Sequence, residues 1–288
     1  MVINRKRAPV LLLFALSLAV SGIDIYSQTA DKFLGIKLRP EIGAIVKEVE
    51  AKTGAGIHAE FIAQTDHLLA SSFIDDNGVA IVLVDLSLRG DLKKLEALIT
   101  HELLHLRLRV NNYPTFIFSQ NVRTARGRAI DVEQDNINDL KDLIEHRVFR
   151  AEMERYGLYD LIDLAGDTAA DARNRHGQLD GQADAINYAR AVLEYQKPQD
   201  IRLVRQIYEA NGWTRSLETG AAISDIISRA SIQTPKDVES VFLNCILKLY
   251  SSPKRSVTFK LTPDASNKHF WRLVVRTASP DPKGGKVN

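Results

Sequence analysis

The stretch Leu98-Ile-Thr-His-Glu-Leu-Leu-His-Leu106 carries His101, Glu102 and His105 in the order H-E-x-x-H. In a helix, residues four positions apart lie one above the other, so both imidazoles face the same point in space. Glu102 follows His101 by about 100° around such a helix, close enough to take a proton from a molecule held there. This stretch therefore predicts a helix that presents two imidazoles and a carboxylate to one site.

The surrounding sequence predicts that this helix is long and buried, over residues 92–110. One side of it is aliphatic throughout, with Leu92, Leu95, Ile99, Leu103, Leu106 and Val110. The side that carries His101 and His105 also has apolar neighbours, and a helix that is apolar nearly all round is buried. Buried imidazoles need partners. Two neutral imidazoles and one further ligand make an open tetrahedral zinc site whose fourth position can hold water.

A helix and a small sheet are predicted upstream of the motif. Residues 40–53 have apolar side chains at helical spacing, and Gly54-Ala-Gly56 ends this helix. Residues 57–62 alternate in polarity as a strand does. The turn signal Asp75-Asp-Asn-Gly78 predicts a β-hairpin. Its second arm, residues 79–84, is a continuous β-branched run that we expect to be buried on both faces.

The chain downstream of the motif is predicted to be mainly helical. A second long helix covers residues 131–156, with an inner face made by Ile137, Leu140, Ile144, Val148 and Ala151. Four further helical patterns lie at residues 183–195, 200–209, 216–230 and 235–249. Runs of β-branched and aromatic residues at 257–261 and 270–275 predict a terminal β-hairpin.

This order of elements around Thr100-His-Glu-Leu-Leu-His-Leu106 resembles that of the zincin metallopeptidases, over roughly residues 40–160. The longer H-E-x-x-H-x-x-G-x-x-H form is absent, because Leu108 and Asn111 stand where its glycine and third histidine would be. The chain is therefore similar to the gluzincin-like members, in which a glutamate on a later helix is the third zinc ligand. The resemblance implies an α+β fold, a bound Zn²⁺ and peptide-bond hydrolysis.

The second long helix supplies the candidates for the third ligand. A ligand belongs at the edge of the buried stripe, and Glu145 lies nearer the predicted inner face than His146 does. We therefore expect Glu145 to be the third ligand, with His146 as the alternative and Glu152 behind both. Asp142 and Asp139 are candidates to accept the outer N–H of a metal-bound imidazole, since such imidazoles usually donate it to a carboxylate or a carbonyl.

Composition excludes other classes of function. The formal net charge of the 288-residue chain is +2, which gives no basic surface for nucleic acid. Cys245 is the single cysteine, so no internal disulfide can form. It lies in an apolar run, and we expect it to be a small buried hydrophobic residue.

The N-terminus has the parts of a secretory signal peptide. Asn4-Arg-Lys-Arg7 is basic, and Ala19-Val-Ser-Gly22 offers the small residues that signal peptidase needs. The apolar run between them, residues 8–20, spans about 13 residues and is short of the roughly 20 that a membrane-spanning helix requires. We expect residues 1–21 to be cleaved and the protein to be exported, either periplasmic or secreted, with an uncleaved N-terminal anchor as the alternative.

These patterns divide the α+β chain into a zincin-like domain and an extra, mostly helical C-terminal region. The expected boundaries are 32–165 for the zincin-like domain, 178–251 for the helical region, 255–278 for the terminal hairpin and 279–288 for a disordered tail.

The motif and the resemblance together predict an exported zinc metallopeptidase, a hydrolase that acts on a peptide or protein substrate. His101, His105 and Glu145 (or His146) would hold Zn²⁺, and Glu102 would be the general base. One alternative is a non-catalytic zincin-like envelope protein that binds a protein partner through its C-terminal region. The other is a zinc amidase that acts on cell-wall peptides.

Overall fold

The computed structural model describes residues 32–63, 69–118, 132–164, 169, 173, 181–195, 197–250, 257–265 and 270–277. The predicted signal peptide (residues 1–21) and the predicted tail (residues 279–288) lie outside these residues. Within them, every helix is too short or too polar to cross a membrane. The α+β class predicted from the sequence is confirmed.

The predicted β-hairpin is present and belongs to a three-stranded sheet in the order β3-β5-β4. β4 (Ala70–Ile74) pairs antiparallel with β5 (Ala80–Asp85), and β3 (His58–Ile62) pairs parallel with β5. At the turn, Gly78 has a φ of 82°, and Asp75 Oδ1 accepts hydrogen bonds from the backbone N–H groups two and four residues later. This Asx-type turn explains why the sequence signal was reliable.

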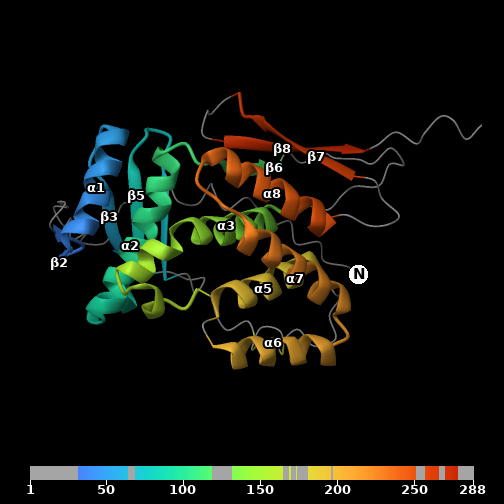
Figure 1. Cartoon of the computed structure of the whole chain (residues 1–288). Helices are drawn as coiled ribbons and strands as arrows, with labels where there is room; N and C mark the ends of the chain where they lie inside the picture. The colour runs from blue at the N-terminus through green and yellow to red at the C-terminus, as the bar shows by residue number, and fades with distance from the viewer. Residues whose placement is uncertain are drawn as a thin grey trace, which may run out of the picture.

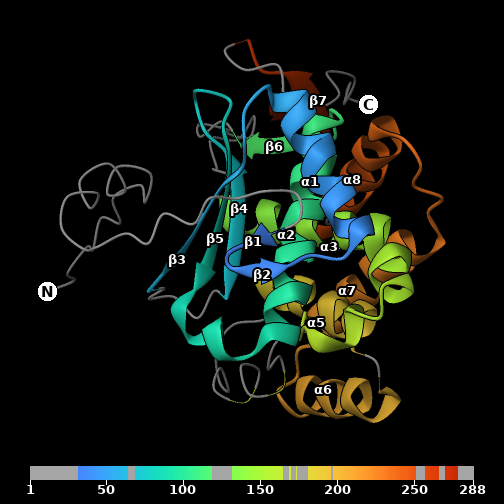
Figure 2. The ribbon, with the colours of Figure 1, turned by 90° about the vertical axis from the view of Figure 1, so that its left-hand side faces the viewer.

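Two helices cover one face of this sheet (Figure 2), α1 (Pro40–Thr53) and the motif helix α2 (Leu92–Val110). A short antiparallel pair, β1 (Lys32–Phe33) and β2 (Ile36–Lys37), precedes α1, and a 3₁₀ helix, η2 (Leu86–Gly90), precedes α2. The bounds of α1 and α2 agree with the residues predicted from the sequence.

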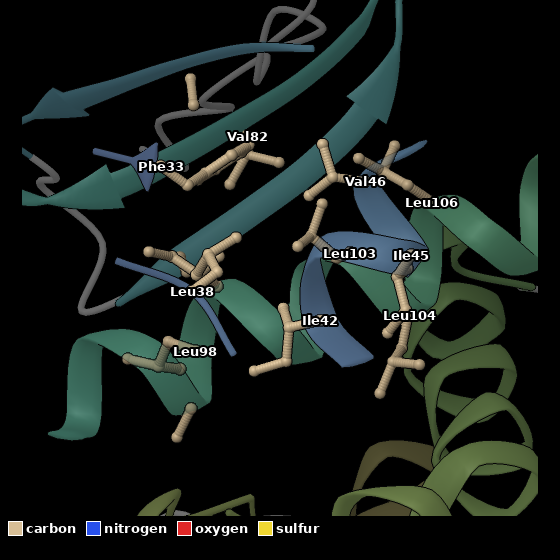
Figure 3. Close-up of a cluster of buried hydrophobic side chains, with 14 of the residues drawn as sticks. Phe33, Leu38, Ile42, Ile45, Val46, Val82, Leu98, Leu103, Leu104 and Leu106 are labelled. Atoms are coloured by element: carbon tan, nitrogen blue, oxygen red, sulfur yellow. The ribbon is translucent and has the colours of Figure 1, made fainter. Parts of the chain in front are cut away.

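The side chains between these helices and the sheet form the N-terminal core (Figure 3), which includes Phe33, Ile42, Val46, Val82, Leu103 and Leu106. The expectation that β5 is buried on both faces was only partly right. Val82 and Val84 face the helices and are fully buried. On the other face Leu83 is buried as expected, whereas Ile81 is only half-buried, so burial of that second face is incomplete.

The further helices whose bounds the structure describes are α3 (Gln134–Arg155), η3 (Tyr159–Leu161), α5 (Gln182–Glu194), α6 (Pro198–Ala210), α7 (Thr214–Arg229) and α8 (Pro235–Tyr250). The five α-helices among them match the predicted helices to within a few residues, whereas the short 3₁₀ helix η3 was not predicted. Side chains from α3, α5, α7 and α8 form the C-terminal core, which includes Leu140, Ile144, Ile186, Ile227, Phe242 and Cys245. The predicted burial of Cys245 is confirmed. A smaller cluster beside α6 includes Tyr188, Val204, Tyr208 and Trp213.

The predicted terminal hairpin consists of β7 (Val257–Pro263) and β8 (Phe270–Thr277), paired antiparallel. The sequence did not predict its third strand. β6 (Thr115–Phe118) follows the motif helix directly and pairs parallel with β8. The chain therefore returns at its C-terminal end to a strand that follows α2, and Figure 1 shows this second sheet beside α8.

The long helix α3 lies across the middle of the molecule and joins the two cores (Figure 1). Its first half buries Ile137, Leu140 and Ile144 in the C-terminal core. Its second half buries Phe149 and Met153 in the N-terminal core. The single inner face predicted for this helix was therefore only partly right: beyond Ile144, Val148 still packs against both cores, but Ala151 does not belong to the buried face.

The last residue of that predicted face, Ala151, is exposed, and Val148 is only half-buried. The helix changes its buried face because it leaves one core and enters the other. The residues at this change, Glu145 and His146, are both buried.

Candidate metal centre

The motif lies in the middle of α2, a helix held at both ends. Asp91 caps its start, because the Asp91 carboxylate accepts a hydrogen bond of 3.0 Å from the Lys94 N–H. The helix ends where Asn112 adopts a φ of 63°. Between these ends, His101, Glu102 and His105 are only 6%, 7% and 6% exposed. The structure thus confirms the buried helix, and polar groups buried in this way need partners.

Three imidazoles meet at one point between α2 and α3. His101 Nε2 lies 3.1 Å from His105 Nε2. His146, from α3, completes a buried group whose ligand atoms all lie within 4.8 Å of one another. The ring centroid of His101 is 4.6 Å from that of His105 and 4.8 Å from that of His146. Two residues from the motif and one from a helix about 40 positions later therefore converge.

The chemistry of this group fits a zinc ion. Burial, and then the electrostatic influence of His105 and His146, lowers the pKa of His101 well below its usual value, so the neutral form of this imidazole is favoured. Neutral imidazole nitrogen is a preferred zinc ligand, and three histidines with one open position are a known catalytic set. His101 Nδ1 is also buried without a hydrogen-bond partner among the described residues.

Glu145 lies behind His105 and outside the group of three imidazoles. Its Oε2 atom is 2.7 Å from His105 Nδ1 and accepts a 2.7 Å hydrogen bond from the Lys141 ammonium. Burial would raise the pKa of Glu145, but the charge of Lys141 and the contact with His105 outweigh burial and lower that pKa. An ionised carboxylate here can accept the outer N–H of His105.

A second group of possible ligands contains His105, Asp142 and Glu145, also within 4.8 Å of one another. This group already holds a positive charge, because the Lys141 ammonium lies 2.7 Å from Glu145 Oε2 and 3.4 Å from Asp142 Oδ1. An ammonium ion between two carboxylates meets their need for a cation. Among the described residues, the three-histidine group has no such internal cation, which makes it the better metal position of the two.

The other candidates from the sequence lie elsewhere. Arg107 binds the carboxylate of Glu152 with a 3.0 Å contact, and the hydroxyl of Tyr156 donates to the same carboxylate. Asp139 pairs with Arg190 at 2.9 Å. Of the expected outer carboxylates, only Asp142 is beside the site.

The sequence reasoning missed three residues beside the histidines: Lys141, Phe149 and Glu194. Lys141 lies one helical turn before Glu145, and Phe149 lies one turn after His146, so helical spacing could have indicated both. Glu194 Oε1 lies 3.1 Å from His146 Nδ1, although Glu194 follows His146 by 48 positions. No local pattern in the sequence links those two residues.

Phe149 packs against all three imidazoles. Its ring centroid lies 5.4 Å from that of His101, 5.0 Å from that of His105 and 5.6 Å from that of His146. This aromatic ring keeps water away from that side of the group. A dry wall of this kind strengthens the electrostatic interactions within the site.

The edge strand β4 is attached to the motif helix. The Ser72 hydroxyl donates a 3.2 Å hydrogen bond to the backbone oxygen of Glu102, and the Arg109 guanidinium donates to the backbone oxygen of Ser72. β4 pairs only with β5 among the described strands, so the sheet edge next to the motif is formed by this strand.

In comparisons with known proteins, no family model, curated protein or solved structure matched this chain.

Proposed function

We propose that this protein is an exported, zincin-like metallopeptidase that binds one zinc ion through His101, His105 and His146. The convergence of three buried imidazoles, two of them from the H-E-x-x-H helix, is the observation that carries the proposal. The proposal takes His146 as the third ligand, since Glu145 faces the outer nitrogen of His105 and the ammonium of Lys141. The basic and apolar N-terminal segment supports export.

A zinc ion bound here would supply Lewis-acid chemistry, polarising water and the scissile carbonyl. Glu102 would accept a proton from the attacking water and return it to the leaving amine. His105 would be kept in one orientation by Glu145, and Phe149 would exclude water from one side of the site. The edge strand β4 would align an extended peptide by backbone hydrogen bonds at positions other than the Ser72 oxygen, which Arg109 binds.

The test combines zinc stoichiometry with one variant of the general base. Purified protein should contain one zinc ion per chain. It should also cleave members of a mixed peptide library, and mass spectrometry detects the products. Glu102→Gln should retain the zinc and lose hydrolysis by about 10²–10⁴-fold, because general-base catalysis contributes about that much. Glu218→Gln, at an exposed position on α7, is the matched control and should behave like the parent.

Two outcomes would reject the proposal: no zinc in the parent protein, or full activity in Glu102→Gln. A parent that binds zinc but cleaves no member of the library would instead favour a zincin-like binding protein.

A further inference from the structure

We infer that Glu194 and Tyr159 are positioning residues for His146, so that the C-terminal helical region is an integral part of the metal centre. The inference rests on the proposed zinc site and assigns a role to a region for which the sequence predicted no chemistry. The outer nitrogens of His105 and His146 each face a buried carboxylate, but the two carboxylates come from different parts of the chain.

Both oxygens of Glu194 are engaged. Oε1 lies 3.1 Å from His146 Nδ1, and Oε2 accepts a 2.5 Å hydrogen bond from the Tyr159 hydroxyl. The Glu194 side chain is only 3% exposed, so water cannot readily replace either contact. With both oxygens bound, the carboxylate has one orientation, and it fixes the plane of the His146 ring.

The position of Glu194 is set by α3, the helix that carries His146. Glu194 is the last residue of α5. Arg150, one helical turn after His146, donates a 2.6 Å hydrogen bond to the backbone oxygen of Leu193. The same guanidinium lies over the Tyr159 ring, 4.4 Å from its centroid. Arg150 therefore holds both partners, the end of α5 and Tyr159, beside the histidine.

This arrangement has a chemical consequence for His146. A carboxylate that accepts the N–H of Nδ1 leaves the lone pair of Nε2 free and makes the imidazole a stronger base. Removing such an outer partner typically weakens metal binding about 10–100-fold.

Glu145 does the same for His105 from within α3, next to His146 in sequence. Glu194 does so from a helix that begins 36 positions after His146, at Gln182. The outer support of His105 thus belongs to the predicted zincin-like segment, whereas that of His146 depends on the packing of α5 against α3.

The experiment measures zinc affinity by competition with a chromophoric chelator, in the full-length protein. Glu194→Ala should weaken affinity about 10–100-fold. Glu194→Gln keeps an acceptor oxygen and should lose less than about tenfold in zinc affinity. Tyr159→Phe should also lose less zinc affinity than Glu194→Ala does. Glu209→Ala removes an exposed glutamate on α6 and should match the parent. The visible spectrum of the cobalt-substituted protein should change in Glu194→Ala and not in Glu209→Ala.

A second readout needs no metal. In the metal-free parent at alkaline pH, the ¹⁵N shifts of His146 should report a single tautomer with the proton on Nδ1. In Glu194→Ala this preference should be lost. Thermal unfolding of each metal-free variant separates a local effect on the imidazole from a general loss of stability. If Glu194→Ala does not fold, zinc affinity and the His146 tautomer are measured in the size-conserving variants Glu194→Gln and Tyr159→Phe instead.

The inference fails if folded Glu194→Ala binds zinc as tightly as the parent and keeps the parent tautomer at His146. That result leaves the proposed function intact, because the parent still binds zinc and cleaves peptides. Conversely, a parent that binds no zinc rejects the proposed function and, with it, the part of this inference that concerns a metal centre. The tautomer measurement then decides only whether Glu194 orients His146.

Discussion

The two halves of α3 lie in different surroundings although they belong to one continuous helix. The first half packs Ile137, Leu140 and Ile144 into the C-terminal core, whereas the second half packs Phe149 and Met153 into the N-terminal core. The buried face therefore turns part-way along the helix. The polar residues at this turn, Glu145 and His146, are directed to the site rather than to solvent.

This comparison shows why a polar site can exist inside an otherwise apolar molecule. Each core is filled by aliphatic and aromatic side chains, but neither core fills the junction between α2 and α3. The junction is occupied by three imidazoles, each carrying polar nitrogens that must be satisfied. One carboxylate partner comes from α3 and one from α5, so both parts of the chain contribute.

The largest expected effect is on zinc affinity, and it distinguishes Glu145 from His146, the two residues at the junction. His146→Ala should lose more affinity for zinc than the roughly 10–100-fold that loss of an outer partner costs, because it removes a proposed ligand. Glu145→Gln should lose less than about tenfold, since the amide oxygen still accepts from His105. Equilibrium competition against a chelator measures both. The reverse order of effects would mean that Glu145 is the ligand, as the sequence pattern had favoured.

The next effect compares one large side chain from each core. Phe149→Ala and Phe242→Ala each remove a buried ring, and each should lower the free energy of unfolding by about 3–5 kcal/mol. Only Phe149 touches the imidazoles, whereas Phe242 stacks on Phe116 with centroids 3.7 Å apart. Denaturant unfolding and zinc titration should therefore show equal instability but weaker zinc binding in Phe149→Ala alone. Equal loss of zinc affinity would mean that the site depends on overall packing.

The smallest effect concerns a glycine in each region. An added Cβ at Gly220 on α7 would lie 2.4 Å from the backbone oxygen of Ala185 on α5. Gly220→Ala should therefore destabilise the protein by about 1–3 kcal/mol, although alanine in a helix usually gains about 1 kcal/mol over glycine. Gly90→Ala, where nothing lies within 4 Å of the added carbon, is the control and should be near neutral. Thermal unfolding measures the stability of both variants. A Gly220→Ala protein more stable than the parent would contradict the close packing of α5 and α7.

Local chemistry made much of the fold predictable from the sequence. The bounds of α1 and α2, the hairpin at Asp75–Gly78 and the burial of Cys245 follow from periodicity, turn residues and apolar runs. The spacing of His101 and His105 likewise needs only one turn of helix to bring their rings together. These features involve residues within one element or within a few positions of one another.

Tertiary structure alone decided the features that join distant segments. Periodicity assumes one buried face per helix, and that assumption fails for α3 because the helix passes from one core to another. The change of face, and not local propensity, brought His146 to the motif and left Glu145 behind His105. The pairing of β6 with β8 and the contact between His146 and Glu194 are of the same kind. The sequence determined which chemistry is available, and packing between elements determined which groups meet.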